Sequence, residues 1–319
     1  MTLLEIPGEA EWHALRAKHI GASQVAALFN VQADYQPGVY ALWQAKAGNV
    51  PLPPVEAERT KWGLRLEEAI ATAAAEREGW DVRPGRYASH ESGLGATLDR
   101  IIAAPSPEDY AGGFVGPGAL ELKNVDWLQT RRGKAWKGEP PPHVLLQLQA
   151  QLAATGFTWG AIAWLVGGND LRVLRYKARP AICAEIIKRV RAFWQSIRAN
   201  NPPLPDGSDA TYAALLALRE EPENDGPADL RGDNEAEAAA ADFARGVAMA
   251  KEGRALRDKA RAILLTKCNG HSWALTNSAR VSLAFVPAKP PRPAEAGEVI
   301  PGRAASVRVT VRMEDETNV

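Results

Sequence analysis

Residues 95–102 read GATLDRII and residues 118–123 read GALELK, and these two runs decide the fold. Apolar and charged side chains alternate in the second run, which predicts a strand. Because side chains two apart on a strand point to the same face, Glu121 and Lys123 project together, with the leucines of the run buried behind them. The prolines and glycines between the runs indicate a loop or hairpin that brings them side by side. The sequence therefore predicts that Asp99 lies beside Glu121 and Lys123.

This trio suits metal-assisted hydrolysis of phosphodiesters. Mg²⁺ prefers hard oxygen ligands and keeps several waters, so one or two carboxylates with substrate phosphate oxygens are enough to hold it. The metal polarises the phosphate and activates a bound water, and a neighbouring lysine positions or deprotonates that water. An acid, a gap and Glu-x-Lys also arise by chance in soluble proteins. The alternative is that Glu121 and Lys123 form a solvated strand face.

The composition is that of an ordinary globular protein. The 319 residues are 46% hydrophobic and 24% charged, with a formal net charge of zero, and they suffice for one large or two modest domains. Charge is nevertheless uneven, because 123–137 and 172–198 are basic and 220–242 is acidic. Local charge governs where an anionic polymer docks.

Targeting and redox signals are absent from the sequence. The two cysteines provide neither a disulfide framework nor the spacing of metal ligands. We find no basic-then-apolar leader and no apolar run long enough to span a bilayer. These features predict a soluble protein in a reducing, cytoplasmic setting, without a membrane partner.

Residues 1–207 are expected to form the core of the protein. Helices are expected at 9–18, 39–47, 62–79, 143–155 and 181–198, and strands at 80–88, 98–102, 119–123, 158–166 and 171–176. Strands flanked by helices on both sides predict an α/β fold with a central mixed sheet. The Asn-Pro-Pro-Leu-Pro-Asp-Gly run at 201–207 marks a boundary.

Residues 208–319 are expected to form an accessory region that is mostly helical. The sequence predicts a short helix at 210–219, a long alanine-rich helix at 234–267, a small hairpin over 271–285 and a strand at 306–312. No motif in this region indicates a function.

Two residues near the start of the chain offer a site for phosphate. Ser23 precedes a short helix through Phe29 and suits an N-cap, because its hydroxyl can accept from a free backbone N–H. A helix N-terminus also favours phosphate, and Arg16 adds a cation just upstream. The alternatives are plain capping for Ser23 and a solvated helix charge for Arg16.

Three further places offer polar or cationic groups. Adjacent Glu67 and Glu68 point about 100° apart on their helix, so at most one can face a buried site. Gln147 is either a satisfied structural amide or a group that positions water or phosphate. The loop at 124–138 combines cations with Trp136, which suits contact with a DNA strand; the equal alternative is a surface loop whose tryptophans are anchored in the core. The cations of that loop include Arg131, Arg132 and Lys134.

Together these signals resemble the YqaJ-like viral recombinase family, the phage-type alkaline exonucleases typified by lambda exonuclease. The ordered signals are Arg16 with Ile20-Gly-Ala-Ser23, Gly63-x-x-x-Glu67, Thr97-Leu-Asp99, Glu121-Leu-Lys123, Gln147-Leu-Gln149 with Thr155-Gly156, and the Pro-Pro-x-x-Asp-Gly boundary. The resemblance covers about residues 10–207. Leu98 stands where the family usually has a proline before its first acid.

The resemblance implies the PD-(D/E)xK restriction-endonuclease-like fold and a Mg²⁺-dependent exonuclease. Such an enzyme degrades the 5′ strand at duplex DNA ends and leaves a 3′ overhang for a single-strand annealing protein. The resemblance also implies a ring-shaped homotrimer and two Mg²⁺ ions, which Mn²⁺ can replace.

The resemblance also implies roles for individual residues. Asp99, Glu121 and the carbonyl of Leu122 would bind metal, and Glu67 would complete the environment of a second ion. Lys123 would orient or activate water with support from Gln147. The 5′ phosphate would be held by Arg16, Ser23 and Thr97.

Two other functions remain open from the sequence. The same fold could serve a site-specific endonuclease, or the protein could be a non-catalytic DNA-binding scaffold. The scaffold is disfavoured because unused carboxylates gathered in one pocket repel one another and cost stability.

Overall fold

The computed structural model describes residues 2–5, 8–52, 58–132, 136, 138–219, 228–288, 292–293, 299–300 and 306–313. The chain divides into two compact units, Met1–Glu221 and Pro222–Val319, and each is described by itself. The helix that follows residue 207 belongs to the first unit. A functional division at residue 207 stays a prediction.

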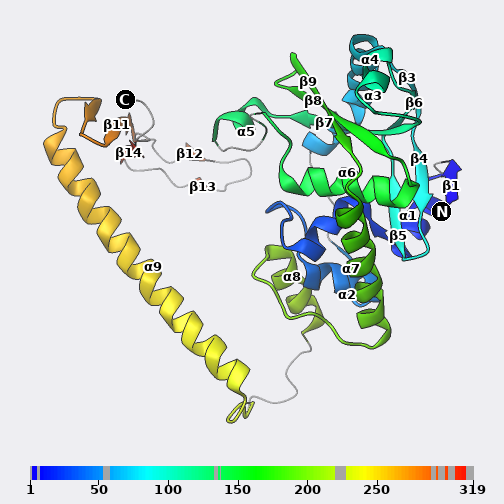
Figure 1. The fold of residues 1–319 in the computed structure, drawn as a ribbon. Helices are drawn as coiled ribbons and strands as arrows, with labels where there is room; N and C mark the ends of the chain where they lie inside the picture. Colours follow the sequence, from blue (N-terminus) through cyan, green and yellow to red (C-terminus); the bar gives the residue numbers. More distant parts are fainter. Residues whose placement is uncertain are drawn as a thin grey trace. The chain divides into compact units, whose positions relative to one another are not determined.

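A five-stranded mixed sheet forms the centre of the first unit (Figure 1), in the order β3-β6-β7-β8-β9. Its strands are β3 (Asp81–Pro84), β6 (Arg100–Ala104), β7 (Gly118–Val125), β8 (Trp159–Val166) and β9 (Asp170–Lys177). The pair β7–β8 is parallel and the other pairs are antiparallel. The antiparallel register of β6 and β7 pairs Arg100 with Leu120, so the two runs that decide the fold lie side by side, as predicted.

A second sheet of four strands joins the first through the chain around Asp99. Its order is β1-β4-β5-β2, from β1 (Thr2–Glu5), β4 (Arg86–Ser89), β5 (Leu94–Thr97) and β2 (Ile20–Gly21). The prediction of a single strand over 80–88 is wrong. The segment forms two strands, β3 and β4, because the chain leaves the first sheet at Gly85 and enters the second. A Cβ at Gly85 would lie 1.8 Å from the carbonyl oxygen of Leu98. Only glycine permits this approach, and the contact fixes the backbone next to Asp99.

Helices cover both faces of the five-stranded sheet, which confirms the predicted α/β fold class. Ile70, Ala71 and Ala74 of α3 (Glu58–Glu78) pack in one cluster with Leu120 and Leu122 of β7. The opposite face meets α6 (Pro142–Thr155), whose buried side chains include Val144, Leu148 and Leu152. Neighbours on β7 thus alternate between an α3 side and an α6 side. This alternation directs Glu121 and Lys123 toward α6.

The remaining helices of the first unit surround this core (Figure 1). They are α1 (Glu9–Ala17), the 3-10 helix η1 (Ala22–Phe29), α2 (Val39–Ala47), α4 (Pro107–Ala111), α5 (Trp127–Arg132), α7 (Pro180–Arg198) and α8 (Asp209–Leu218). The helix α4 corrects the expectation that the link between β6 and β7 contains no helix. Ser106 caps it and Pro107 starts it, which is the preferred use of both residue types.

A buried ionic network ties α3, α4 and β9 together. Asp109 is 3% exposed and accepts hydrogen bonds from the indole of Trp80 at 2.5 Å and the hydroxyl of Ser106 at 2.9 Å. It also pairs with Arg175, whose guanidinium donates to Glu78 at 2.6 Å. Such a buried carboxylate is tolerated because every partner is present.

The second unit contains a long helix and a small sheet. The helix α9 (Asn234–Lys267) buries none of its residues, and the sheet order is β10-β11-β14. These strands are β10 (Trp273–Leu275), β11 (Ala279–Val286) and β14 (Ser306–Met313), and β12 (Arg292–Pro293) pairs with β13 (Val299–Ile300). The predicted long helix and hairpin are therefore confirmed. Among the described helices of the whole chain, none has the length and hydropathy needed to cross a bilayer.

Replacing Asp109 by alanine should lower the free energy of unfolding by about 3 kcal/mol, because Trp80 and Arg175 lose their buried acceptor. Urea unfolding at neutral pH measures this loss. The exposed neighbour Glu108→Ala is the matched control and should cost less than about 1 kcal/mol. Equal costs for both variants would contradict the network.

The same variant gives a pH test of the network. Burial alone would raise the pKa of Asp109, but hydrogen bonds from Trp80 and Ser106 and the charge of Arg175 outweigh it and lower the pKa. A lowered carboxyl pKa adds stability at neutral pH that disappears as the pH falls below about 4 toward the folded value. The gap in stability between the native protein and Asp109→Ala should therefore narrow at pH 3. A gap independent of pH would contradict this assignment.

Candidate active site

Glu121 is a fully buried carboxylate on β7, on the side of the sheet that α6 covers, and it is 0% exposed. Its Oε1 accepts hydrogen bonds from Nζ of Lys123 and, at 2.6 Å, from Nε2 of Gln147. Its Oε2 accepts from Nε2 of Gln151 at 2.5 Å. A charge taken out of water needs such partners. Together they hold the carboxylate in one orientation.

Lys123 carries a firmly protonated ammonium group. Burial alone would lower the pKa of Lys123, but the carboxylates of Glu121 and Asp99 outweigh this effect and raise the pKa. Its side chain keeps 30% exposure. An ammonium with a raised pKa is a poor general base and a good donor. The arrangement therefore suits orientation of water or stabilisation of developing negative charge.

Asp99 lies where the chain passes from the second sheet into the first. Its Oδ2 accepts from the backbone N–H of Leu122 at 2.8 Å, which ties it to β7. Burial raises the pKa of Asp99 well above its usual value, the Glu121 carboxylate raises it further, and the Lys123 ammonium opposes both. The bond to Leu122 aims the second carboxylate oxygen away from the strand.

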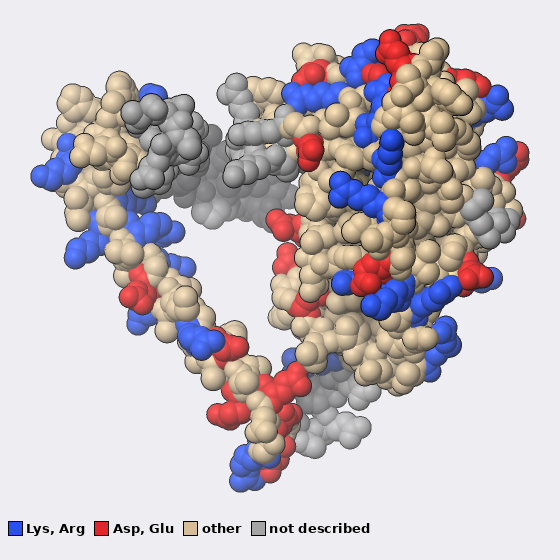
Figure 2. Space-filling view, viewed as in Figure 1, with Lys and Arg blue, Asp and Glu red and all other residues tan. Residues whose placement is uncertain are grey.

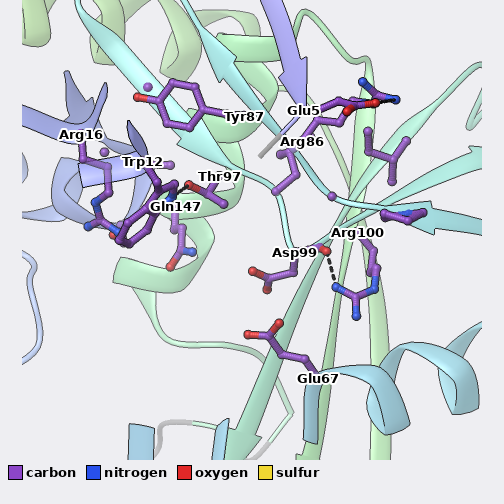
Figure 3. A pocket seen from close by; sticks show the side chains of 18 of the residues that line it. Glu5, Trp12, Arg16, Glu67, Arg86, Tyr87, Thr97, Asp99, Arg100 and Gln147 are labelled. Atoms are coloured by element: carbon purple, nitrogen blue, oxygen red, sulfur yellow. Dashed lines mark hydrogen bonds and ion pairs between the residues drawn. The ribbon is translucent and has the colours of Figure 1, made fainter. Parts of the chain in front are cut away.

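Glu67 of α3 completes a group of three acids. Burial raises the pKa of Glu67, Arg100 opposes this, and Glu121 adds to the rise. Figure 3 shows the carboxylates of Glu67 and Asp99 facing each other. Adjacent Glu68 lies at the exposed side of the same cavity and pairs with Arg100 at 2.6 Å, so its charge is already partnered.

This donor set fits a divalent cation with a partial water shell. Within the described part of the chain, no group of three or more His, Cys, Asp or Glu side chains is arranged to hold a metal ion. Mg²⁺ needs only one or two carboxylates beside water and phosphate oxygens. Asp99 and Glu67 supply hard oxygens, and a cation between them would offset the burial and the nearby Glu121 carboxylate that raise their pKa values.

A cavity of about 1140 Å³ joins these acids to the predicted phosphate residues. Its wall is formed by side chains of the first unit, and Figure 3 shows them. They include Arg16, Ser23, Glu67, Thr97, Asp99 and Gln147. Residues far apart in sequence thus line one continuous space.

Arg16 places a positive charge in this cavity. Its guanidinium lies 4.4 Å from the centre of the Trp12 ring, and burial lowers its pKa. Among the described residues, no carboxylate pairs with it. Lys46 donates to the carbonyls of Arg16 at 2.5 Å and His19 at 2.7 Å, so a second cation secures the end of α1. An unpaired guanidinium in a cavity is suited to bind an anion.

Thr97 and Ser23 lie in the same cavity, but Ser23 does not cap η1. Gly21 is the N-cap, and its backbone N–H donates to Oε1 of Gln24 at 3.0 Å. The capping prediction for Ser23 was therefore wrong, because the longer glutamine side chain reaches back to the turn. The hydroxyl of Thr97 accepts from the indole of Trp12 at 3.1 Å. Trp12 thus links Thr97 to Arg16.

The basic loop after β7 is described in part. The side chains of Arg131, Arg132 and Lys134 lie outside the described residues. Trp136 is buried, with its ring centre 5.8 Å from that of Trp164. This position corrects the expected DNA contact at Trp136 and matches the alternative of a tryptophan anchored in the core.

Gln151 is the site residue that sequence reasoning missed. It is 0% exposed, and its Nε2 also lies 3.4 Å from the carbonyl of Thr97. It follows Gln147 by four residues, so both amides lie on one side of α6. That spacing was visible in the sequence.

Comparison with known proteins finds one family and one relative that are similar in sequence to this chain. A model of the YqaJ-like viral recombinase domain matches residues 11–158. The chain is 28% identical over 233 residues to the uncharacterized protein YqaJ of Bacillus subtilis (strain 168), which spans 70% of this chain and 67% of that protein.

Two solved structures are also similar to this chain. LHK-Exo in complex with dAMP is 21% identical, with a TM-score of 0.49, over 65% of this chain and 97% of that chain. The alkaline exonuclease LHK-Exo from Laribacter hongkongensis is 18% identical, with a TM-score of 0.45, over the same shares.

The α/β core brings an acid, Glu-x-Lys and a helix-borne glutamine together, as the sequence predicted. Residues 11–158 are similar to the YqaJ-like viral recombinase domain, which confirms the predicted resemblance.

Changing Gln151 to leucine should impair both stability and metal binding. Oε2 of Glu121 would lose its buried donor, at a cost of about 1–3 kcal/mol in unfolding free energy. Affinity for Mn²⁺, measured by titration calorimetry, should fall about 10-fold or more, because a group that orients a ligand is lost.

The matched control is Gln149→Leu on the same helix. Gln149 is also buried, but it donates to the carbonyl of Lys177 and not to Glu121. It should lose stability while keeping its affinity for Mn²⁺. Equal Mn²⁺ affinities in the two variants would contradict a role for Gln151 at the site.

Proposed function

We propose that this protein is a Mg²⁺-dependent exonuclease that degrades the 5′ strand at the ends of linear duplex DNA. One observation carries the proposal: acids suited to a metal line the same cavity as Arg16, an arginine that no described carboxylate pairs with and that suits a phosphate. A metal site alone would fit many hydrolases. An adjoining site for a terminal phosphate favours an enzyme that starts at an end.

The acids would bind the metal, and the metal would hold the scissile phosphate next to them. Asp99, Glu121 and the carbonyl of Leu122 are the proposed ligands of one ion, and Glu67 serves a second. Mg²⁺, or Mn²⁺ in its place, supplies an activated water and polarises the phosphate when bound. Glu121 can accept its hydrogen bonds and still offer a lone pair, since each carboxylate oxygen has two.

Lys123 and Gln147 would orient the attacking water, and Lys123 would also offset the negative charge that develops on the phosphate. Both donate to the same oxygen of Glu121, so they lie at one edge of the acid group. The protonated ammonium of Lys123 offsets negative charge that develops on the phosphate. Gln147 lines the cavity, where its amide can hold a water or a phosphate oxygen.

Arg16, with Ser23 and Thr97, is proposed to hold the 5′ phosphate of the strand that is digested. A guanidinium forms strong, paired hydrogen bonds with phosphate. Holding the terminal phosphate at a fixed place relative to the acids would set which bond is cut. The product would be a duplex with a 3′ single-stranded overhang.

The family resemblance supports three further proposals about the setting of this enzyme. We propose that it assembles as a ring-shaped homotrimer around DNA. We propose that a single-strand annealing protein receives the 3′ overhang in phage-type recombination. The expected setting is the cytoplasm.

A linear duplex labelled on each strand in turn tests the proposed reaction. With Mg²⁺, the 5′-phosphorylated strand should disappear from its end while the opposite strand persists. Glu121→Gln should slow this loss on the order of 100-fold or more, because a ligand charge is removed. Addition of EDTA should stop it.

Closed circular DNA is the control substrate. It should remain intact, because an end-dependent enzyme finds no terminus on it. Cutting of the circle at fixed positions would support a site-specific endonuclease instead. If the protein binds DNA but hydrolyses none with any divalent ion tested, the result would support a non-catalytic DNA-binding scaffold instead.

Arg16→Ala tests the recognition of the end. On 5′-phosphorylated duplex the rate should fall about 10- to 100-fold, as for the loss of hydrogen bonds between charged groups worth 1.5–3 kcal/mol. On 5′-hydroxyl duplex the rate should change little, because the contact is already missing. Equal slowing on both substrates would contradict the proposal that Arg16 binds the 5′ phosphate.

A further inference from the structure

The helix α9 carries its charges in two separate halves. Residues 234–250 hold three acids and one arginine, whereas residues 251–267 hold six lysines and arginines and two acids. Figure 2 shows Lys and Arg gathered on the half of α9 near β11 and Asp and Glu near its start. The neutral total charge of the chain hides this local excess of positive charge.

The cations of the second half form a stripe along one side of the helix. Arg254, Arg257 and Arg261 follow one another at intervals of three and four residues, and Lys251 precedes them by three. Residues at this spacing lie on one face of an α-helix. The large apolar residues Leu256 and Ile263 lie away from this stripe, since neither stands three or four residues from Arg254 or Arg257. We call Lys251, Arg254, Arg257 and Arg261 the basic stripe.

The basic stripe is exposed and incompletely neutralised. Every one of its residues is exposed in the second unit. Within the described part of the chain, Lys251 and Arg254 have no ion-pair partner, and Arg257 is 3.2 Å from its exposed neighbour Asp258. Surface pairs of that kind contribute little and are readily exchanged for other partners. Lys251 and Arg254 are therefore the cations of the stripe that an external anion can reach without displacing a described partner.

An aromatic residue stands close to the end of this half of the helix. Six residues after α9 ends, β10 begins at Trp273, which is 50% exposed. The guanidinium of Arg280 lies 4.8 Å from the centre of its ring. Exposed aromatic and cationic side chains together are typical of surfaces that bind nucleic acid.

We propose that the basic stripe of α9 binds the phosphate backbone of duplex DNA. The cations repeat along about 15 Å of helix, which follows from 1.5 Å per residue over ten residues. A duplex presents phosphates over that distance on both strands. Backbone contacts of this kind carry no sequence information and suit an enzyme that moves along DNA. The inference rests on the proposed function only for the choice of DNA as ligand.

A DNA dumbbell, a duplex closed by a loop at both ends, tests this surface separately from the active site. It offers no terminus to the cavity, and EDTA in the buffer prevents metal-dependent hydrolysis. The full chain is titrated against a labelled dumbbell and binding is followed by fluorescence anisotropy at several salt concentrations. The test variant combines Arg254→Ala, Arg257→Ala and Arg261→Ala, because alanine preserves helix propensity.

The triple variant should bind the dumbbell about 10-fold or more weakly, and the slope of log affinity against log salt should fall by about 2–3. The matched control removes three acids from the first half of the helix, by Glu235→Ala, Glu237→Ala and Asp242→Ala. This control should bind the dumbbell at least as tightly as the native chain does. Circular dichroism checks that both variants keep their helix.

Unchanged affinity and salt slope in the triple variant would overturn the proposal. If DNA binding is unchanged and the mass in solution, measured by light scattering, falls, the stripe is a contact between protein chains and the DNA assignment fails. A native protein that binds the dumbbell but digests no linear duplex would end the proposed function and leave this inference standing.

Discussion

The site depends on supplying hydrogen-bond donors to one carboxylate that is buried inside the protein. Glu121 is fully buried, and its two oxygens receive three donors, one from its own strand and two from α6. Taking a charge out of water costs several kcal/mol unless partners replace the lost hydration. The demand for those donors fixes which face of β7 meets α6. It also explains why two glutamines stand among the apolar residues of that helix.

The second constraint is the junction between the two sheets. At Gly85 the chain passes so close to Leu98 that a side chain would not fit, and Asp99 follows directly. Asp99 is then tied to the backbone of Leu122, so the two acids of the site are joined through main chain as well as through charge. The four-stranded sheet and α1 bring Arg16 and Thr97 to the same cavity. One change of sheet thus brings the acids close to the residues that we propose to bind the phosphate.

Local patterns in the sequence predicted the fold and the position of the acids well, and the details that depend on tertiary contact less well. Alternation over 118–123 was sufficient for β7, because Leu120 and Leu122 make one face of that stretch apolar. The break at Gly85 could not be predicted, since it arises from contact with residue 98. The N-cap of η1 was predicted wrongly because the helix already begins at Ala22, which makes Gly21 and not Ser23 its N-cap. Gln151 was overlooked because its role depends on which face of α6 meets β7.

The central claim is that Asp99 and Glu121 hold a divalent ion in the cavity that also contains Arg16. Crystal diffraction of the protein with Mn²⁺, at a wavelength where manganese scatters anomalously, tests it most directly. The account predicts an anomalous peak about 2.0–2.3 Å from oxygens of Asp99 and Glu121. A peak elsewhere in the protein, with none at these two carboxylates, would contradict it.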